Sequence, residues 1–247
     1  MTAVGGDALI SAQENRRMFD GIAQRYDLLN ALMSLGLQRR WRHQAIRTVL
    51  SGSGSDFLDV GCGTGDMALA LLRRSPTARL TGIDFSTAMV SLAIAKTREA
   101  GLEARAHYQI GDATSLPMGN GSFDGITCAF CLRNIVDRAA AFREMRRVLR
   151  PGGTVAILEL TKPAGTLAGL AHRLYIRRLV PLLGALLSRG SAYRYLAASI
   201  DNFPPAPEIV AAMERAGFVH SESTPLTGGF VTLFSGRAPD ARRGEAA

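Results

Sequence analysis

Short apolar runs alternate along the chain with longer segments in which apolar residues recur every three or four positions. The first pattern is typical of buried strands and the second of amphipathic helices. Together they predict strands at Phe57–Val60, Arg79–Phe85, His107–Ile110, Phe123–Phe130 and Thr154–Leu160. They also predict helices over Met67–Leu72, Ser86–Ala100 and Ala139–Leu149. Because strands and helices alternate, we expect an α/β fold with a doubly wound sheet.

The N-terminal part of the chain has helical periodicity only. Apolar residues within Arg16–Leu37 predict amphipathic helical pieces with a break near Asp27–Asn30, and a further helix follows over Trp41–Leu50. We consider two roles for this helical segment, residues 16–50. It either packs against one side of the core or forms a lid over a ligand, with Tyr26 at its inner end.

The C-terminal part returns to the strand pattern. A helix over Glu208–Ala216 precedes strands at Phe218–Ser223 and Phe230–Gly236, which we expect to close the sheet as an antiparallel pair. Residues 1–15 and 238–247 have little periodicity and are expected to be flexible tails. We therefore expect one domain over residues 16–237.

Composition narrows the class of protein. The 247 residues carry a net charge of +8, but no basic run interleaved with aromatic residues indicates nucleic-acid binding. No run of 18 apolar residues lacks a charge or a breaker, and Met1–Asn15 does not have the pattern of a secretory signal. These features favour a cytoplasmic location.

The three cysteines, Cys62, Cys128 and Cys131, do not suggest a disulfide framework. Cys128 and Cys131 have the C-x-x-C spacing of redox and metal sites. There is no second cysteine pair and the four histidines are scattered, so we expect no metal site and interpret the cysteines as small buried residues at a strand end.

A glycine-rich turn follows the first predicted strand. Three glycines, at Gly61, Gly63 and Gly65, allow positive φ and a close approach of backbone N–H groups to a ligand. A dinucleotide-binding loop has its third glycine one position later, where this chain has Asp66. Acids at Asp59 and Asp66 favour a cationic ligand, S-adenosylmethionine, over a pyrophosphate.

Acids also follow the second and third strands. Asp84 lies 84 − 65 = 19 residues beyond Gly65, where an acid binds the hydroxyls of a ribose, and Asp112 suits an adenine amino group. Because parallel strands end at one edge of a sheet, we expect Asp59, Asp84 and Asp112 to share a site there.

These motifs resemble those of the class I S-adenosylmethionine-dependent methyltransferases and, more narrowly, of the quinone-ring C-methyltransferases of menaquinone and ubiquinone biosynthesis. The resemblance spans about residues 18–236 and rests on Leu58–Asp66, Asp84, Asp112-Ala113, Leu149–Gly153, Met18–Asp27, Phe130–Asn134, Tyr193–Leu196 and Leu226–Gly229. It implies a seven-stranded Rossmann-like sheet. It also implies cofactor contacts from Thr64, Asp84, Asp112, Ala113 and Ala129.

The resemblance implies C-methylation of a prenylated quinol. The first acceptor is demethylmenaquinol, with 2-methoxy-6-polyprenyl-1,4-benzoquinol second and another lipophilic phenol or secondary metabolite as the alternative. A non-catalytic cofactor-binding or membrane-scaffolding protein is the rival class. Arg133 is expected to stabilise the phenolate, with Asn134 and Tyr26 orienting the hydroxyl or a water, because an arginine is a poor base.

A helical insertion, residues 165–203, follows the fifth strand and is rich in leucine and arginine. It is too short and too charged to span a bilayer, so it either caps the core, forms a groove for a prenyl tail, or lies at the inner face of the membrane. A prenylated quinol, the membrane surface and a second copy in a homodimer are the expected partners.

Overall fold

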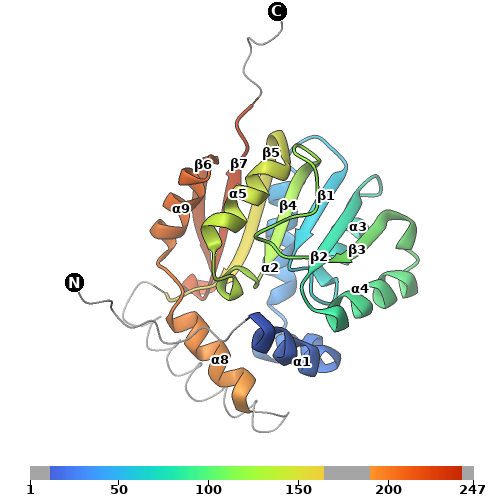
Figure 1. Ribbon diagram of the computed structural model, residues 1–247, viewed down its shortest axis with the longest axis vertical. Helices are drawn as coiled ribbons and strands as arrows, with labels where there is room; N and C mark the ends of the chain where they lie inside the picture. The colour runs from blue at the N-terminus through green and yellow to red at the C-terminus, as the bar shows by residue number, and fades with distance from the viewer. Residues whose placement is uncertain (1–11, 164–189, 241–247) are drawn as a thin grey trace, which may run out of the picture.

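A seven-stranded sheet forms the centre of the computed structural model, which describes residues 12–163 and 190–240 (Figure 1). The strands are β1 (Asp56–Val60), β2 (Arg79–Asp84), β3 (Ala106–Ile110), β4 (Phe123–Ala129), β5 (Leu149–Leu160), β6 (Val219–Leu226) and β7 (Val231–Arg237). Their order is β3-β2-β1-β4-β5-β7-β6. Only β7 pairs antiparallel with its neighbours, β5 and β6, so the expected doubly wound sheet is confirmed.

Helices cover both faces of the sheet. They are α1 (Ala12–Met33), α2 (Gln38–Val49), α3 (Asp66–Arg74), α4 (Thr87–Glu99), α5 (Arg138–Val148), α8 (Gly190–Asp201) and α9 (Ala206–Arg215), with short 3-10 turns η1 (Glu103–Arg105), η2 (Leu132–Asn134) and η4 (Thr227–Gly229). Apolar residues of α2, α3 and α4 form one buried cluster and those of α5 and α9 form another. Alternate residues of β5 belong to opposite clusters, Val155 and Ile157 to the second and Ala156 and Leu158 to the first, as expected for a strand buried on both faces.

The strand order places a crevice at the carboxyl ends of β1 and β4. From β1 the chain continues to β2 and β3 on one side, and then crosses to β4 on the other side of β1. Open α/β sheets bind ligands where the order reverses in this way. Helices α1 and α8 lie at this end of the molecule, opposite the described C-terminal end of the chain (Figure 1).

Several predicted boundaries differ from the structure. Helix α1 is continuous, and the predicted break near Asp27–Asn30 is wrong; the chain turns only after it, at Leu35 and Gly36, whose φ angles are 50° and 77°. Because α1 begins at Ala12, residues 12–15 of the predicted tail are helical.

The C-terminal boundaries also differ. Strand β5 begins at Leu149 rather than at the predicted Thr154. It contains a bulge before Thr154, where its register with β4 shifts and Gly152 has a φ of 74°. The predicted C-terminal tail begins too early: Ala238 is buried and its N–H donates to Gly153 O over 2.8 Å. Residues 165–189 of the predicted insertion and 241–247 of the tail lie outside the described residues.

Within residues 12–163 and 190–240, no helix is long and apolar enough to cross a membrane.

Candidate active site

A hollow at the carboxyl ends of β1, β2 and β4 is the candidate site. It has a volume of about 320 Å³, including space open to solvent. Its lining comes from α1, the glycine loop, the end of β2, the start of α4, and the end of β4 with the segment after it: Phe19, Tyr26, Gly61, Gly63, Asp84, Phe85, Met89, Ala129, Phe130, Cys131 and Asn134. The site therefore lies at the predicted edge of the sheet, with α1 above it.

The glycine loop has the predicted left-handed backbone. The φ angles of Gly61, Gly63 and Gly65 are 68°, 52° and 84°. A Cβ atom on Gly61 would lie 2.3 Å from the Cys131 sulfur, and one on Gly65 would lie 3.1 Å from the Cβ of Ala93 on α4. Gly61 thus allows Cys131 to pack against the glycine loop, whereas Gly65 allows α3 and α4 to pack closely.

Asp84 lies in the hollow at the end of β2, as predicted. Its carboxylate accepts the Gly63 N–H and the Ser86 N–H, each over 2.9 Å. Burial raises the pKa of Asp84, while these two N–H donors act to lower it. Asp84 therefore ties the glycine loop to the β2 end and presents a carboxylate to the hollow.

Asp59 lies below the hollow rather than in its lining. Thr127 donates to one carboxylate oxygen, Oδ1, over 2.7 Å, and the other, Oδ2, is buried with no hydrogen-bond partner among the described residues. Burial raises the pKa of Asp59 to about 7. A buried acceptor without a donor is costly, so Asp59 is suited to a cationic group that enters from above.

The third predicted acid has a different placement. The exposed carboxylate of Asp112 accepts the N–H and the hydroxyl of Thr114, both over 2.8 Å, in a local turn after β3. Neither Asp112 nor Ala113 lines the hollow, whereas Ala129 does. The structure thus brings Asp84 and Ala129 together in the lining of the hollow, whereas Asp112 and Ala113 are not part of that lining.

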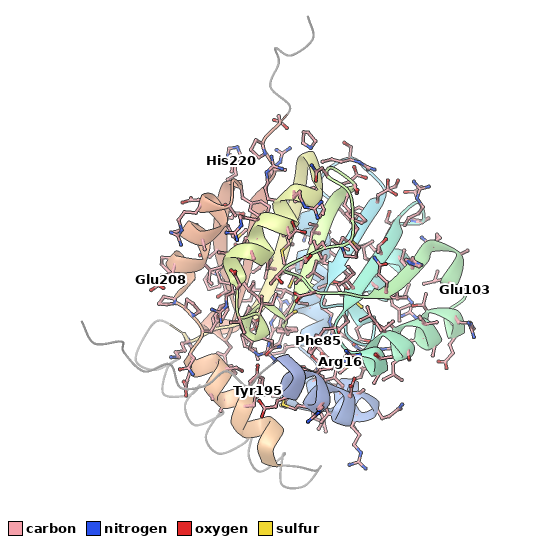
Figure 2. The ribbon with its side chains drawn as sticks, in the orientation of Figure 1. Arg16, Phe85, Glu103, Tyr195, Glu208 and His220 are labelled. Atoms are coloured by element: carbon pink, nitrogen blue, oxygen red, sulfur yellow. The ribbon has the colours of Figure 1, made fainter. Side chains whose placement is uncertain are left out.

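Helix α1 covers the hollow with aromatic residues. The rings of Phe19 and Phe85 meet edge to face at 5.9 Å, and those of Phe19 and Tyr26 at 6.1 Å. Figure 2 shows Arg16, on α1, near Phe85 at the end of the molecule opposite His220. Burial raises the pKa of Tyr26, which is hydrogen-bonded to Asn30, so its phenol keeps its proton at neutral pH.

Polar contacts fix α1 to α4. Asp20 accepts the Ser86 hydroxyl over 2.5 Å, and Arg16 donates to the Thr87 hydroxyl over 2.6 Å. Both contacts lie at the first turn of α4, where an acid is also favoured by the helix dipole. Helix α1 is therefore anchored at one end beside Phe85.

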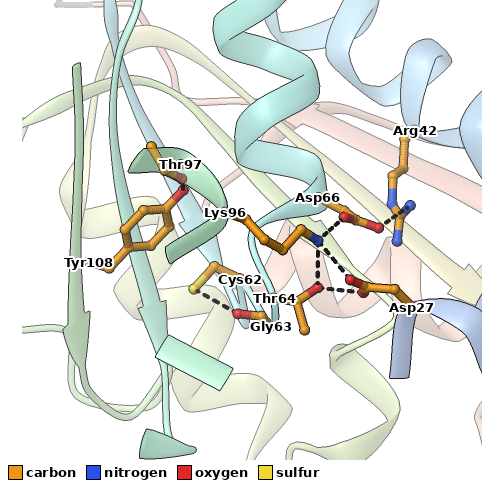
Figure 3. Close-up of polar contacts among 9 residues, drawn as sticks. All are labelled: Asp27, Arg42, Cys62, Gly63, Thr64, Asp66, Lys96, Thr97 and Tyr108. Atoms are coloured by element: carbon orange, nitrogen blue, oxygen red, sulfur yellow. Dashed lines mark hydrogen bonds and ion pairs between the residues drawn. The ribbon is translucent and has the colours of Figure 1, made fainter. Parts of the chain in front are cut away.

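A charged network anchors the other end of α1 (Figure 3). Asp27 of α1 accepts the Thr64 hydroxyl over 2.5 Å and pairs with Lys96 of α4 over 2.7 Å. Lys96 also pairs with Asp66, whose second oxygen lies 3.0 Å from Arg42 of α2. Because two cations neutralise Asp66, its ability to repel a pyrophosphate is weaker than the sequence argument assumed.

The segment after β4 holds a buried ion pair. Nη1 of Arg133 lies 2.7 Å from Oε1 of Glu159, at the end of β5, and both side chains are buried. Burial acts to lower the pKa of Arg133, but Glu159 and Tyr26 raise it overall. The guanidinium does not line the hollow, yet it interacts electrostatically with Tyr26, which does.

Asn134 is the polar residue of this segment that lines the hollow. Its Oδ1 accepts the hydroxyl of Tyr195, from α8, over 2.9 Å. Because that oxygen is engaged, the Asn134 amide N–H groups remain as donors toward the hollow. Of the predicted catalytic residues, Tyr26 and Asn134 thus line the hollow, and Arg133 lies behind them.

Sequence reasoning missed Glu159 and Lys96. Glu159 is an acid within an otherwise apolar strand, which is a signal because a carboxylate is seldom buried without a partner. Lys96 is one of only two lysines, the other being Lys162, but no local pattern links it to Asp27, 69 residues away.

Comparisons with known proteins agree with this geometry. A model of the ubiE/COQ5 methyltransferase family matches residues 9–237. The chain is 41% identical over 224 residues to the ubiquinone/menaquinone biosynthesis C-methyltransferase UbiE of Syntrophotalea carbinolica, covering 91% of this chain and 94% of that one. It is 42% identical over 223 residues to the demethylmenaquinone methyltransferase of Thermus thermophilus, covering 90% and 100%.

Solved structures share the fold at lower identity. The [4+2]-cyclase SpnF has a TM-score of 0.65 at 20% identity, covering 96% of this chain and 100% of that one. A SAM dependent methyltransferase from Aquifex aeolicus has a TM-score of 0.59 at 17% identity, covering 80% and 89%. Since proteins of different activity share this fold, the residues of the site carry the functional argument.

Proposed function

Because the chain belongs to the ubiE/COQ5 methyltransferase family, we propose that it transfers the methyl group of S-adenosylmethionine to a ring carbon of a prenylated quinol. Demethylmenaquinol is the first acceptor and 2-methoxy-6-polyprenyl-1,4-benzoquinol the second. The observation that carries the proposal is the near full-length likeness, at about 40% identity, to relatives named for both quinones and for demethylmenaquinone alone. The alternative acceptor is another lipophilic phenol.

The residues of the hollow fit S-adenosylmethionine. The left-handed glycine loop exposes backbone N–H groups, and the buried Asp84 carboxylate suits two ribose hydroxyls. Below them, Asp59 Oδ2 is a buried acceptor and Arg42 Nε a buried donor, each without a hydrogen-bond partner among residues 12–163 and 190–240. The ammonium and carboxylate of an amino acid would complement these two groups.

Arg42 and Asp59 also interact with each other electrostatically, with Arg42 lowering the pKa of Asp59. A zwitterionic amino-acid group near both side chains satisfies the acid with a cation and the arginine with an anion. We assign Asp59 and Arg42 to the methionine end of the methyl donor, and Gly61, Gly63, Thr64, Gly65, Asp84 and Ala129 to its remainder. Asp112 and Ala113 stay predictions for the adenine side.

The bound donor supplies an electrophilic methyl group on a sulfonium. The acceptor supplies a ring carbon, which becomes nucleophilic when an adjacent phenol loses its proton. The protonated phenol of Tyr26 and the amide of Asn134 can donate hydrogen bonds to the quinol oxygens and fix the ring in line with the methyl group. Positioning of this kind is the main contribution expected from the chain.

Arg133 stabilises the phenolate at longer range. Its guanidinium remains charged, so it does not act as the base, and its pairing with Glu159 holds it in place behind Tyr26. Its Nε is buried and has no hydrogen-bond partner among the described residues, which leaves one donor for a water or an acceptor oxygen. A water relay or solvent then carries away the phenol proton.

Contact with the inner face of the membrane is part of the proposal. At the end of α1 and in the turn after it, Leu28, Leu32 and Leu35 are 55%, 40% and 78% exposed. The exposed arginines Arg39 and Arg40 follow them in sequence. Exposed leucines beside cations suit an anionic lipid surface, the source of a prenylated quinol.

Flotation with anionic liposomes tests the membrane contact. Leu35→Ser is expected to reduce the bound fraction several-fold, whereas Val219→Ser, on the distant strand β6, is expected to leave it unchanged. Equal binding of all variants would reject the role of this patch.

A homodimer stays a prediction. Sedimentation of the full chain measures its mass in solution and so decides between a monomer and a dimer.

The proposed reaction is tested by the quinones of a strain that lacks this chain. We expect demethylated quinone to accumulate and the ring-methylated form to return when the chain is supplied again. An unchanged quinone profile would contradict the proposed acceptor, and a changed profile of another phenol would favour the alternative.

A further inference from the structure

Cys128 and Cys131 are brought together by a reversal of the chain after β4. In an extended strand, residues three positions apart point to opposite faces. Here Phe130 has a left-handed backbone with a φ of 57°, and the Cys131 side chain lies close enough to Cys128 to raise the pKa of its thiol. The two free thiols therefore form a pair at the C-x-x-C spacing.

The left-handed conformation of Phe130 is held from several sides. Its N–H donates to Leu158 O over 2.8 Å, and its carbonyl accepts Arg133 Nη1 over 2.6 Å. Its ring meets Trp41 edge to face at 6.2 Å. A non-glycine residue at positive φ persists when its surroundings fix it, so the thiol pair is a built feature of this segment.

Only one thiol of the pair faces the hollow. Cys131 lines it and is half-buried, whereas Cys128 is fully buried behind it. The neighbouring Cys131 thiol and burial raise the pKa of Cys128, so Cys128 holds its proton while Cys131 is the accessible sulfur. The third cysteine, Cys62, does not line the hollow and its thiol faces Gly63 O.

The proposed acceptor has an oxidised form that reacts with thiols. A 1,4-quinone with an unsubstituted ring carbon is a soft electrophile at that carbon, and the same carbon is the one to be methylated. A quinone that enters the hollow in the oxidised state cannot form the phenolate that the methyl transfer needs. The residues beside it, Tyr26 and Asn134, share the hollow with the Cys131 sulfur.

We infer that Cys131 and Cys128 form a redox-active dithiol that reduces an oxidised 1,4-quinone in the hollow to its quinol and becomes a disulfide. The inference rests on the proposed function for the identity of the ligand. It gives the chain a second activity, conversion of the wrong redox form of its acceptor into the nucleophile that it methylates.

The proposed reduction of the quinone proceeds in two steps. The Cys131 sulfur attacks the unsubstituted ring carbon, the C=C electron pair moves to one carbonyl oxygen, and that oxygen takes the Cys131 proton. The Cys128 sulfur then attacks the Cys131 sulfur, and the S–C pair moves into the ring as the second carbonyl oxygen takes the Cys128 proton. Two thiols are oxidised to a disulfide and one quinone is reduced to one quinol.

The test uses the full chain, reduced with dithiothreitol and then freed of it under argon. It is mixed with a 2-prenyl-1,4-naphthoquinone whose third ring position is unsubstituted. We expect about one equivalent of quinol per chain and a loss of two hydrogen masses, located in the tryptic peptide Ala106–Arg133, which contains both cysteines but not Cys62. The analogue methylated at the third position is expected to react at least about tenfold more slowly.

Single variants separate the two thiols. In Cys128→Ser, the first step lacks its resolving thiol, so the intact mass is expected to rise by one quinone. Cys131→Ser is expected to show neither the adduct nor the quinol, and Cys62→Ser is expected to behave as the unmodified chain. An unchanged mass in the unmodified chain, or loss of the reaction in Cys62→Ser with its retention in Cys131→Ser, would overturn the inference.

The same preparations are assayed for methylation of a quinol that was reduced chemically beforehand. Methylation without thiol oxidation rejects the dithiol activity and leaves the proposed function in place. Thiol oxidation without methylation rejects the proposed function instead. Cys128→Ala, which changes a core side chain outside the hollow, is expected to methylate the prepared quinol and to fail only when supplied with the quinone.

Discussion

Arg133 and Glu159 form a buried ion pair, with 2.7 Å between Nη1 and Oε1, directly behind the hollow that Tyr26 and Asn134 line. The other oxygen of Glu159 accepts the backbone N–H of Arg133 over 2.9 Å. Glu159 therefore fixes both the guanidinium and the backbone of the segment after β4. A buried carboxylate positions a cation that is proposed to act on the acceptor.

Replacing one residue of the Arg133–Glu159 ion pair is expected to lower the stability of the fold more than replacing both residues. Glu159→Ala leaves Arg133 buried without its carboxylate, and we expect a loss of about 3–5 kcal/mol of unfolding free energy. The double variant Arg133→Met/Glu159→Leu is expected to regain most of that stability, since an apolar pair can replace a buried ion pair. Urea unfolding measures the free energy of unfolding of the single and the double variant.

The double variant also separates a structural Arg133 from a catalytic one. If Arg133 stabilises the phenolate, the refolded double variant binds S-adenosylhomocysteine normally yet loses about two to three orders of magnitude in kcat. Full turnover in that variant would show that Arg133 serves only the fold.

Helix α1 is expected to loosen from α4 when Lys96 is replaced. Lys96→Met leaves Asp27 and Asp66 without their shared cation, and because these side chains are partly exposed we expect a loss of only about 1 kcal/mol in stability. The larger effect is faster tryptic cleavage at the exposed Arg16 and Arg17 of α1. Arg79→Met, which removes an exposed pair with Asp56 at the other edge of the sheet, is the control and is expected to leave that cleavage unchanged.

Asp59 is expected to make stability and donor binding depend on pH. Its pKa is raised from 3.8 to about 7 in the folded chain, so between these values the folded state holds a proton that the unfolded state has lost. Its contribution to stability therefore falls as pH rises through this window. The burial of Asp84 acts in the same direction.

Donor binding should show the opposite trend. The ammonium of S-adenosylhomocysteine favours the carboxylate form of Asp59, so binding releases a proton below pH 7 and affinity rises from about pH 5.5 to 7.5. Calorimetry in buffers of different ionisation enthalpy measures the number of protons released when the ligand binds. In Asp59→Asn, the affinity is expected to be about tenfold weaker and the proton release smaller; an unaltered release would assign the proton to another group.

Gly61 and Gly63 are expected to differ in their tolerance of a side chain. Gly61→Ala places a Cβ atom 2.3 Å from the Cys131 sulfur at a φ of 68°, and should cost about 2–5 kcal/mol of stability. A Cβ atom on Gly63 lies 3.9 Å from Tyr26, so Gly63→Ala should cost only the strain of its φ, about 1–2 kcal/mol. Cys131→Gly in the Gly61→Ala background should recover part of the difference, which thermal unfolding measures.

The order of strands and helices was predictable because each element carries its own local period. The alternation of buried residues along β5 and the capping of α4 by Ser86, which accepts the Met89 N–H, need only neighbours in sequence. Boundaries were less predictable. Helix α1 continues through Asp27–Asn30, where Asp27 contacts Lys96 of α4, and no local pattern contains that contact.

The sequence was sufficient to predict which acids follow the strands at the site, but not which of them face the hollow. Asp84 and Asp112 both follow strands that end at one edge, yet Asp84 faces the hollow and Asp112 faces solvent, because Thr114 holds the Asp112 carboxylate in a local turn. Likewise, the segment after β4 indicated Arg133, while Glu159 lies 26 residues away on the next strand. Partners joined only by the topology of the sheet are visible in the structure alone.

Transfer of an isotopically labelled methyl group from S-adenosylmethionine to a prenylated naphthoquinol decides whether the chain acts as proposed. The purified chain is incubated with labelled donor and chemically reduced demethylmenaquinol, and the product is analysed by mass spectrometry with fragmentation. We expect one labelled methyl group on the ring carbon. A chain that binds S-adenosylhomocysteine but methylates no prenylated quinol, or that places the label on a phenolic oxygen, would contradict the proposed ring C-methylation.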